Sequence, residues 1–161
     1  MKKLLLSLAA LSLLSASCKK SSSSSPSPST PDNGWKMGTT TYTSVFVARS
    51  GSSPTSASLT ALDALPTAAT QNKCTIYFSA FPSAGGTFRV ASVGSVISLS
   101  ATQIGVTAQI GSTFYASTGF DGIDATVTVT GGKIKVVVPD VWVKNIAGSD
   151  SSKLTGTILE N

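Results

Sequence analysis

The sequence predicts an all-β fold, and the favoured form is an antiparallel β-sandwich of eight or nine short strands. Past residue 34, Thr, Val, Ser and Gly dominate the composition. Short apolar stretches alternate with polar residues at a period of two, and no stretch supports a helix of useful length. Because consecutive hairpins favour an up-and-down order, a closed calycin- or lipocalin-like barrel is the alternative architecture.

The expected strands are short and are separated by turn residues. They cover residues 42–48, 73–81, 87–92, 96–99, 104–110, 113–117, 123–130, 133–144 and 154–159. Residues 59–64 fit either a short strand or a helical turn, and Pro66 ends that element. The turn chemistry of residues 82–86 makes 87–92 the expected hairpin partner of 73–81. Pro139 is expected to interrupt the strand that begins at residue 133.

The clearest pattern runs from residue 123 to residue 138 and is broken only by Gly131-Gly132. A two-residue turn pairs Thr130 with Lys133, which fixes the register of the whole hairpin. The pairs expected on one apolar face are Val129–Ile134, Val127–Val136 and Ala125–Val138. The register that the turn requires is also the one that burial requires, because a slip of one residue would turn these side chains outward.

The first part of the chain has the features of a lipoprotein signal peptide. Lys2 and Lys3 precede a short apolar segment, residues 4–14, and small residues lead into Cys18. The segment is too short to cross a bilayer, which takes roughly 20 apolar residues. Cleavage before Cys18 would leave a thiol that can be acylated, so Cys18 is the expected lipidation site. The alternative is an ordinary secretory signal that is cut at the same small residues.

Composition divides the chain into three parts. Residues 1–17 are the expected signal peptide, residues 18–34 a flexible tether rich in Ser and Pro, and residues 35–161 a single β-domain. The tether has too few apolar side chains to offset the entropy cost of ordering. After residue 34, eight Lys and Arg stand against six Asp and Glu, which gives a net charge near +2. This net charge is too small to indicate a nucleic-acid-binding surface, so no nucleic acid is expected as a partner.

The leader, the Cys18-Lys19-Lys20 start and the Ser/Pro tether resemble those of short, uncharacterised lipoproteins of Bacteroidota that carry a lipid-anchored β-domain. Further similarity lies in Trp35, in Gly85-Gly86-Thr87 and in the closing residues 153–158. The resemblance implies a lipoprotein of the cell envelope, attached to the outer membrane. It implies the β-fold more than any specific activity.

The chain contains no histidine, and this narrows the possible chemistry. Ser-His-Asp and Cys-His catalysis and the common zinc sites are all removed. Asp121 and Asp124 are candidates for a calcium site, but Asp-Gly before a strand is more typical of a turn than of the many oxygens that calcium needs. We therefore expect no metal, no cofactor and no catalytic activity. A histidine-free hydrolase with two facing carboxylates is the enzyme alternative.

Three aromatic residues are candidates for a ligand-binding surface: Tyr77, Tyr115 and Trp142. They alternate with residues expected in the core, so an outer sheet face would carry some of them, where aromatic rings bind sugars or proteins. If both sheet faces are partly buried, these rings are core residues instead, which is the simpler interpretation. Cys74 alternates with Ile76, which indicates a buried, unreactive thiol.

Three functions follow from these observations. The favoured one is a non-catalytic, lipid-anchored envelope lipoprotein whose β-domain serves binding, adhesion or structural interaction. The first alternative is a carbohydrate-binding accessory lipoprotein that uses exposed aromatic side chains, and the second is the histidine-free hydrolase. The expected partners are the membrane, through the lipid on Cys18, and an envelope protein or a glycan.

Overall fold

A computed structural model describes residues 32–51, 57–92, 98–119 and 122–161. Over these ranges eleven strands form one mixed sheet, and none of the described residues forms an α-helix. The predicted all-β class is therefore confirmed. The strands are β1 (Gly34–Met37), β2 (Thr40–Thr43), β3 (Phe46–Ser50), β4 (Ala57–Leu62), β5 (Lys73–Phe78), β6 (Gly86–Ala91), β7 (Gln103–Ile110), β8 (Thr113–Ser117), β9 (Asp124–Thr130), β10 (Lys133–Asn145) and β11 (Ser151–Leu159).

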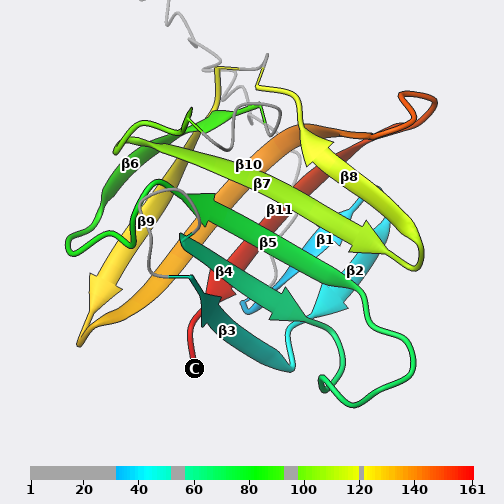
Figure 1. The fold of residues 1–161 in the computed structure, drawn as a ribbon, viewed down its shortest axis with the longest axis horizontal. Coiled ribbons are helices and arrows are strands. Elements are labelled where there is room, and N and C mark those ends of the chain that lie inside the picture. The colour runs from blue at the N-terminus through cyan, green and yellow to red at the C-terminus, as the bar shows by residue number, and fades with distance from the viewer. Residues whose placement is uncertain (1–31, 52–56, 93–97, 120–121) are drawn as a thin grey trace, which may run out of the picture.

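The sheet folds over on itself into two layers (Figure 1). Its strand order is β2-β1-β11-β10-β9-β6-β7-β5-β4-β3, and β8 pairs with both β7 and β10. In Figure 1, β9, β10, β11, β1 and β2 lie behind β7, β5, β4 and β3. β6 connects the layers, because it pairs with β9 in an antiparallel and with β7 in a parallel sense.

The two ends of this strand order are consecutive in the chain. Ser44 and Val45 alone separate β2 from β3, and each of them bonds to a different neighbour. The backbone N–H of Ser44 donates to the carbonyl of Asn33 at 3.0 Å, and that of Val45 donates to the carbonyl of Leu62 at 2.8 Å. The sheet thus combines the two layers of a sandwich with the nearly continuous strand order of a barrel.

The hairpin of β9 and β10 has the predicted register. Pairing starts at Thr130 and Lys133, includes the expected pairs Val129–Ile134 and Val127–Val136, and is recorded as far as Thr126 and Val137, one position short of the expected pair Ala125–Val138. The turn residues Gly131 and Gly132 have φ angles of 59° and 78°. A two-residue hairpin turn of this kind requires such left-handed values, which glycine adopts without strain. Turn geometry and burial therefore select the same pairing.

The inward faces of the two layers share one core. Trp35 is fully buried and stacks on Tyr42, with ring centroids 5.2 Å apart. Phe78 meets Phe88 edge-on, with a centroid separation of 6.2 Å. Large aliphatic side chains that are fully buried come from both layers: Leu59, Ile76, Ile104, Ile134, Leu154 and Ile158. Side chains therefore occupy the interior of the folded sheet.

The predicted hairpin between residues 73–81 and 87–92 is wrong. β5 ends at Phe78 and pairs with β4 and β7, while β6 pairs with β9 and β7. Turn residues change the direction of the chain, but they do not select the strand against which the next segment packs. Burial of the inward side chains Phe88 and Val90, where β6 joins the two layers, accompanies that pairing.

Other expected boundaries also shift. Of residues 59–64, the first four belong to a strand, β4, and the last two lie beyond its end, so the strand alternative is the correct one. Of the expected strand 96–99, residues 96 and 97 lie outside the described residues, and Leu99 is buried but is in no strand. Pro139 does not end β10. The pairing of β10 with β11 shifts register between Val138 and Val141, and such a bulge accommodates a residue that cannot donate a hydrogen bond.

The close approach of β1 and β11 gives a test of the core packing. A Cβ atom at Gly156 would lie 2.7 Å from the carbonyl oxygen of Gly34 and 3.0 Å from Cβ of Trp35, whereas one at Gly86 would lie 3.7 Å from its nearest neighbour. We expect Gly156→Ala to lower the free energy of unfolding by about 1–3 kcal/mol. The control Gly86→Ala is expected to change it by less than about 0.5 kcal/mol. Urea denaturation measures both, and equal stabilities would contradict the packing of Trp35 on Gly156.

Candidate functional site

The structure places the three predicted aromatic residues apart from one another, two on opposite outer faces and one against the core. Tyr77 lies between buried residues of β5 and points outward from the layer of β3, β4, β5 and β7. Trp142 is 43% exposed and points outward from β10, in the other layer. Tyr115 on β8 packs against the core. The three rings therefore form no common platform.

Tyr115 joins β8 to the loop between β10 and β11. Its hydroxyl donates a hydrogen bond to Oδ2 of Asp150 at 2.8 Å. This bond raises the pKa of Tyr115, with smaller contributions from burial and from the negative charge of Asp150. A hydroxyl held in this way stabilises the loop, so the phenol has a structural role here.

Trp142 lies among charged side chains on the outer face of β10. It is paired across the strands with Lys153, whose Nζ lies 5.9 Å from the centroid of the indole ring. The same ammonium group is 3.7 Å from Oδ2 of Asp140. A cation over an exposed ring gives a weak attraction, and it makes the surface around Trp142 amphipathic.

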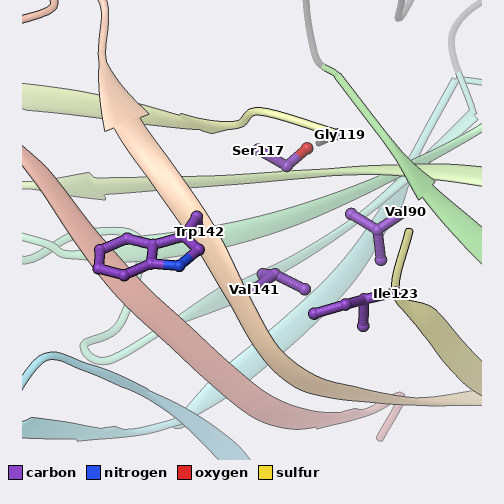
Figure 2. Close-up of a pocket in the computed structure, with 6 residues that line it drawn as sticks. All are labelled: Val90, Ser117, Gly119, Ile123, Val141 and Trp142. Carbon is purple, nitrogen blue, oxygen red and sulfur yellow. The ribbon is translucent and has the colours of Figure 1, made fainter. Parts of the chain in front are cut away.

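A small hollow lies behind Trp142, where β9 and β8 pair with successive segments of β10. Figure 2 shows Val90, Ile123 and Val141 pointing toward one another there, with the Trp142 ring on the other side of β10. The hollow has a volume of about 10 Å³. This is room for about one water molecule, so the hollow does not provide a site for a larger ligand.

Ser117 closes another side of the hollow and joins β6 to β7 and β8. Its buried hydroxyl donates to the carbonyl of Ala91 at 2.6 Å and accepts from the backbone N–H of Val106 at 3.2 Å. Gly119 follows with a φ of 72°, and a Cβ atom there would lie 2.4 Å from the backbone nitrogen of Ser92. Both residues have a structural role at the point where the partner of β7 changes from β6 to β8.

The described carboxylates from Asp63 onward all contact a specific partner. The contacts are Asp63–Asn72, Asp124–Arg89, Asp140–Lys153, Asp150–Tyr115 and Glu160–Arg49. Asp121, one half of the considered calcium pair, lies outside the described residues, and the other half bonds to Arg89. Within the described ranges, no three Cys, Asp or Glu side chains are grouped so that they could hold a metal ion.

The ion pair of Arg49 and Glu160 makes additional hydrogen bonds to the backbone. Nε of Arg49 lies 2.6 Å from Oε1 of Glu160, and a second guanidinium nitrogen donates to the carbonyl of Gly132. Oε2 of Glu160 also accepts from the backbone N–H of Ile134 at 2.9 Å. The pair joins β3 to the end of β11 and to the β9–β10 turn. The bonds from Arg49, aided by the N–H of Ile134, lower the pKa of Glu160 although its burial acts in the opposite direction.

The Arg49–Glu160 contact predicts a pH-dependent contribution to stability. Because folding lowers the pKa of Glu160 below its ordinary value of 4.5, the contribution is complete above that value and is lost as the pH falls through the folded-state pKa. We expect Glu160→Gln to lower the free energy of unfolding by about 1–2 kcal/mol at pH 7. Urea titrations at falling pH should show the difference from the wild type shrinking.

The control for this prediction is Asp140→Asn. Asp140 and Lys153 are more exposed and lie farther apart, at 3.7 Å. An exposed pair of this kind contributes roughly 0–1 kcal/mol, so the variant should stay close to the wild type at pH 7. A Glu160→Gln deficit that stays constant down to pH 3 would contradict the role of the ionised carboxylate.

Two open grooves flank the β7–β8 turn at one end of the sheet. Gln71, Asn72 and Gln109 line the first, of about 420 Å³, and Phe114 and Ile146 line the second, of about 390 Å³. The amides of Gln71 and Asn72 also hydrogen-bond to backbone groups of neighbouring loops. Ile146 is 79% exposed. Alternation and motifs in the sequence do not predict these residues, because loops far apart in the chain form the grooves.

A basic surface extends across the outer side of β1, β11 and β10 and onto β6. We define this basic face by its cationic side chains, Lys36, Arg89, Lys133, Lys135, Lys144 and Lys153, each of which alternates with inward-facing residues of its strand. Asp124 and Asp140 lie on the same side and pair with two of the cations, which leaves a net charge of +4. Of the six lysines in the described part of the chain, only Lys73 lies elsewhere, on β5. The alternation of Lys133 and Lys135 was the sequence signal for this surface.

The two cysteines have different positions. Cys74 is buried in β5, and burial raises the pKa of its thiol to about 12. It is thus protonated at neutral pH and packs as an apolar side chain, as the alternation with Ile76 predicts. Cys18 lies outside the described residues.

Comparison of the chain with protein-family models, with curated proteins and with solved structures finds no match. Among the described residues, no helix has the length and apolar character needed to cross a membrane.

Proposed function

We propose that the chain is a non-catalytic, lipid-anchored lipoprotein of the cell envelope whose β-domain binds a partner through its outer surface. The observation that carries the proposal is the use of the carboxylates. Those of Asp63, Asp124, Asp140, Asp150 and Glu160 each contact another part of the fold. General acid–base catalysis needs a group within reach of the substrate. Carboxylates engaged in structural contacts therefore favour binding over a histidine-free hydrolase.

The packing of the interior directs binding to the outside of the sheet. Trp35, Phe78 and Phe88 occupy the space between the layers together with aliphatic side chains. A small apolar ligand held between layers would need an interior cavity. The outer faces and the loop ends offer the accessible surfaces instead.

The leader supports attachment to the membrane. Residues 1–17 have the charged start, the short apolar segment and the small residues of a lipoprotein signal, and Cys18 follows them directly. More than one acyl chain at that residue would make the attachment stable. The resemblance to Bacteroidota lipoproteins supports the outer membrane as its location.

Anchoring at Cys18 predicts the outcome of acyl labelling in cells. Wild-type protein grown with a labelled fatty acid is expected to carry the label and to enter the detergent phase on phase separation. Cys18→Ser should lose both properties, because the acylated thiol is missing. The matched control is Cys74→Ala, which removes the other cysteine and should keep both. Equal labelling of the wild type and Cys18→Ser would contradict the anchor.

A second candidate function, carbohydrate binding, is favoured by the grooves beside the β7–β8 turn. Amide side chains and an aromatic ring, such as Gln109 and Phe114, are the groups that bind sugar hydroxyls and sugar faces. This function predicts retarded migration through gels that contain a neutral polysaccharide, and a loss of the retardation in Phe114→Ala. Tyr77→Ala, on an outer face away from the groove, is the control and should leave the retardation unchanged.

A further inference from the structure

We propose that the basic face docks on anionic lipid headgroups of the membrane that holds the chain, so that the domain lies against the bilayer. The proposal rests on the anchoring proposed above and names the surface through which the domain makes its contact. Three features support this contact: the distribution of charge, the apolar side chains within the basic face and the point at which the tether enters the domain.

The charge of the described chain is one-sided. The basic face has a net charge of +4, and Asp32, just before β1, would lower it to +3. The other ionised groups are Lys73 and Arg49 against the carboxylates of Asp63, Asp150 and Glu160. The overall charge near +2 is thus the sum of a strongly cationic face and a slightly acidic remainder of the domain. A clustered set of lysines is attracted to an anionic membrane surface.

Apolar side chains lie among these lysines in direct cross-strand pairs. Trp142, 43% exposed, pairs with Lys153, and Leu159, 39% exposed, pairs with Lys135. Lysine extends its apolar stem along such neighbours and keeps its ammonium group in water. Tryptophan is enriched at the headgroup level of membranes for the same amphipathic reason. A soluble acidic polysaccharide would satisfy the charges, but it would not explain Leu159.

The tether enters the domain on the same layer. β1 starts at Gly34, the last residue of the expected tether, and its outward side chain Lys36 belongs to the basic face. Residues 19–33 span at most ~50 Å when fully extended. A domain held within that distance of the bilayer meets the headgroups at a high effective concentration, so weak contacts are sufficient for docking.

The test uses the chain from residue 18 onward with Cys18→Ser, which keeps every described residue and carries no lipid. Vesicles of phosphatidylglycerol and phosphatidylcholine are compared with vesicles of phosphatidylcholine alone. Trp35 is fully buried and Trp142 is exposed, so a blue shift of the emission on docking reports Trp142. We expect the shift with the anionic vesicles only, and we expect it to be absent in Trp142→Phe. Binding to both vesicle types with equal affinity would overturn the proposal.

A matched pair of variants separates the basic face from the total charge. Lys135→Glu and Lys73→Glu change the net charge equally, but only Lys135 lies on the basic face. Lys135→Glu removes one positive charge and adds one negative charge, so with about one lysine's contribution for each of these two charges we expect it to weaken vesicle binding roughly 30-fold in a sedimentation assay. Lys73→Glu should change it less than about threefold, because this lysine faces away from the membrane. Equal losses in the two variants would overturn the proposal. Binding to soluble polyuronate without binding to the anionic vesicles would overturn it as well.

The two proposals fail separately. Because the vesicle assay uses a chain without lipid, a lack of binding to anionic vesicles removes the docking surface and leaves acyl labelling to decide the anchor. Loss of the anchor with vesicle binding intact would leave a secreted protein that docks by charge alone. Lys36→Glu, on a different strand of the basic face, should repeat the result of Lys135→Glu.

Discussion

One sheet that must bury its own apolar face sets the conditions for the rest of this structure. With no described helix to cover that face, the sheet folds over until its two halves pack on each other. The fold is closed by Ser44 and Val45, which link the two end strands β2 and β3 and bond in succession to Asn33 before β1 and to Leu62 of β4. Close approach of β1 and β11 then brings the backbone of Gly156 against Trp35, the largest side chain in the core. A side chain at position 156 would separate these strands.

In such a sheet, polar side chains link the strands where the regular strand pairing changes or ends. On β7 the partner changes from β6 to β8, and the hydroxyl of Ser117 bonds to the backbone on both sides of that change. At the other end, Arg49 and Glu160 join β3, β11 and the β9–β10 turn. A buried hydroxyl with both bonds made costs little, and a half-exposed ion pair contributes modestly. Their value here is that each joins strands far apart in the sequence, and this use leaves few polar groups for chemistry.

The sequence predicted what alternation and local turns determine, and it did not predict what long-range pairing determines. The Gly131-Gly132 hairpin is correct because turn geometry and burial independently require one register. The partner of β6 is wrong because no local feature of residues 87–92 distinguishes β5 from β9. The separation of the candidate aromatic residues could not be predicted for the same reason. Alternation indicates that Tyr77 and Trp142 point outward, but it does not indicate that their strands lie in opposite layers.

The same reasoning explains why the basic face is invisible in the total charge. Lys36, Lys135 and Lys153 are each unremarkable outward residues of a strand, and about a hundred positions separate the first from the second. They share one surface because β11 pairs with β1 on one side and with β10 on the other. A sheet that uses its inner face for packing has only its outer faces for recognition. Here one of them carries six of the eight described cations and only two carboxylates, Asp124 and Asp140. The strand order that closes the core therefore also collects the cationic side chains on one face, and this face can orient the domain on an anionic surface.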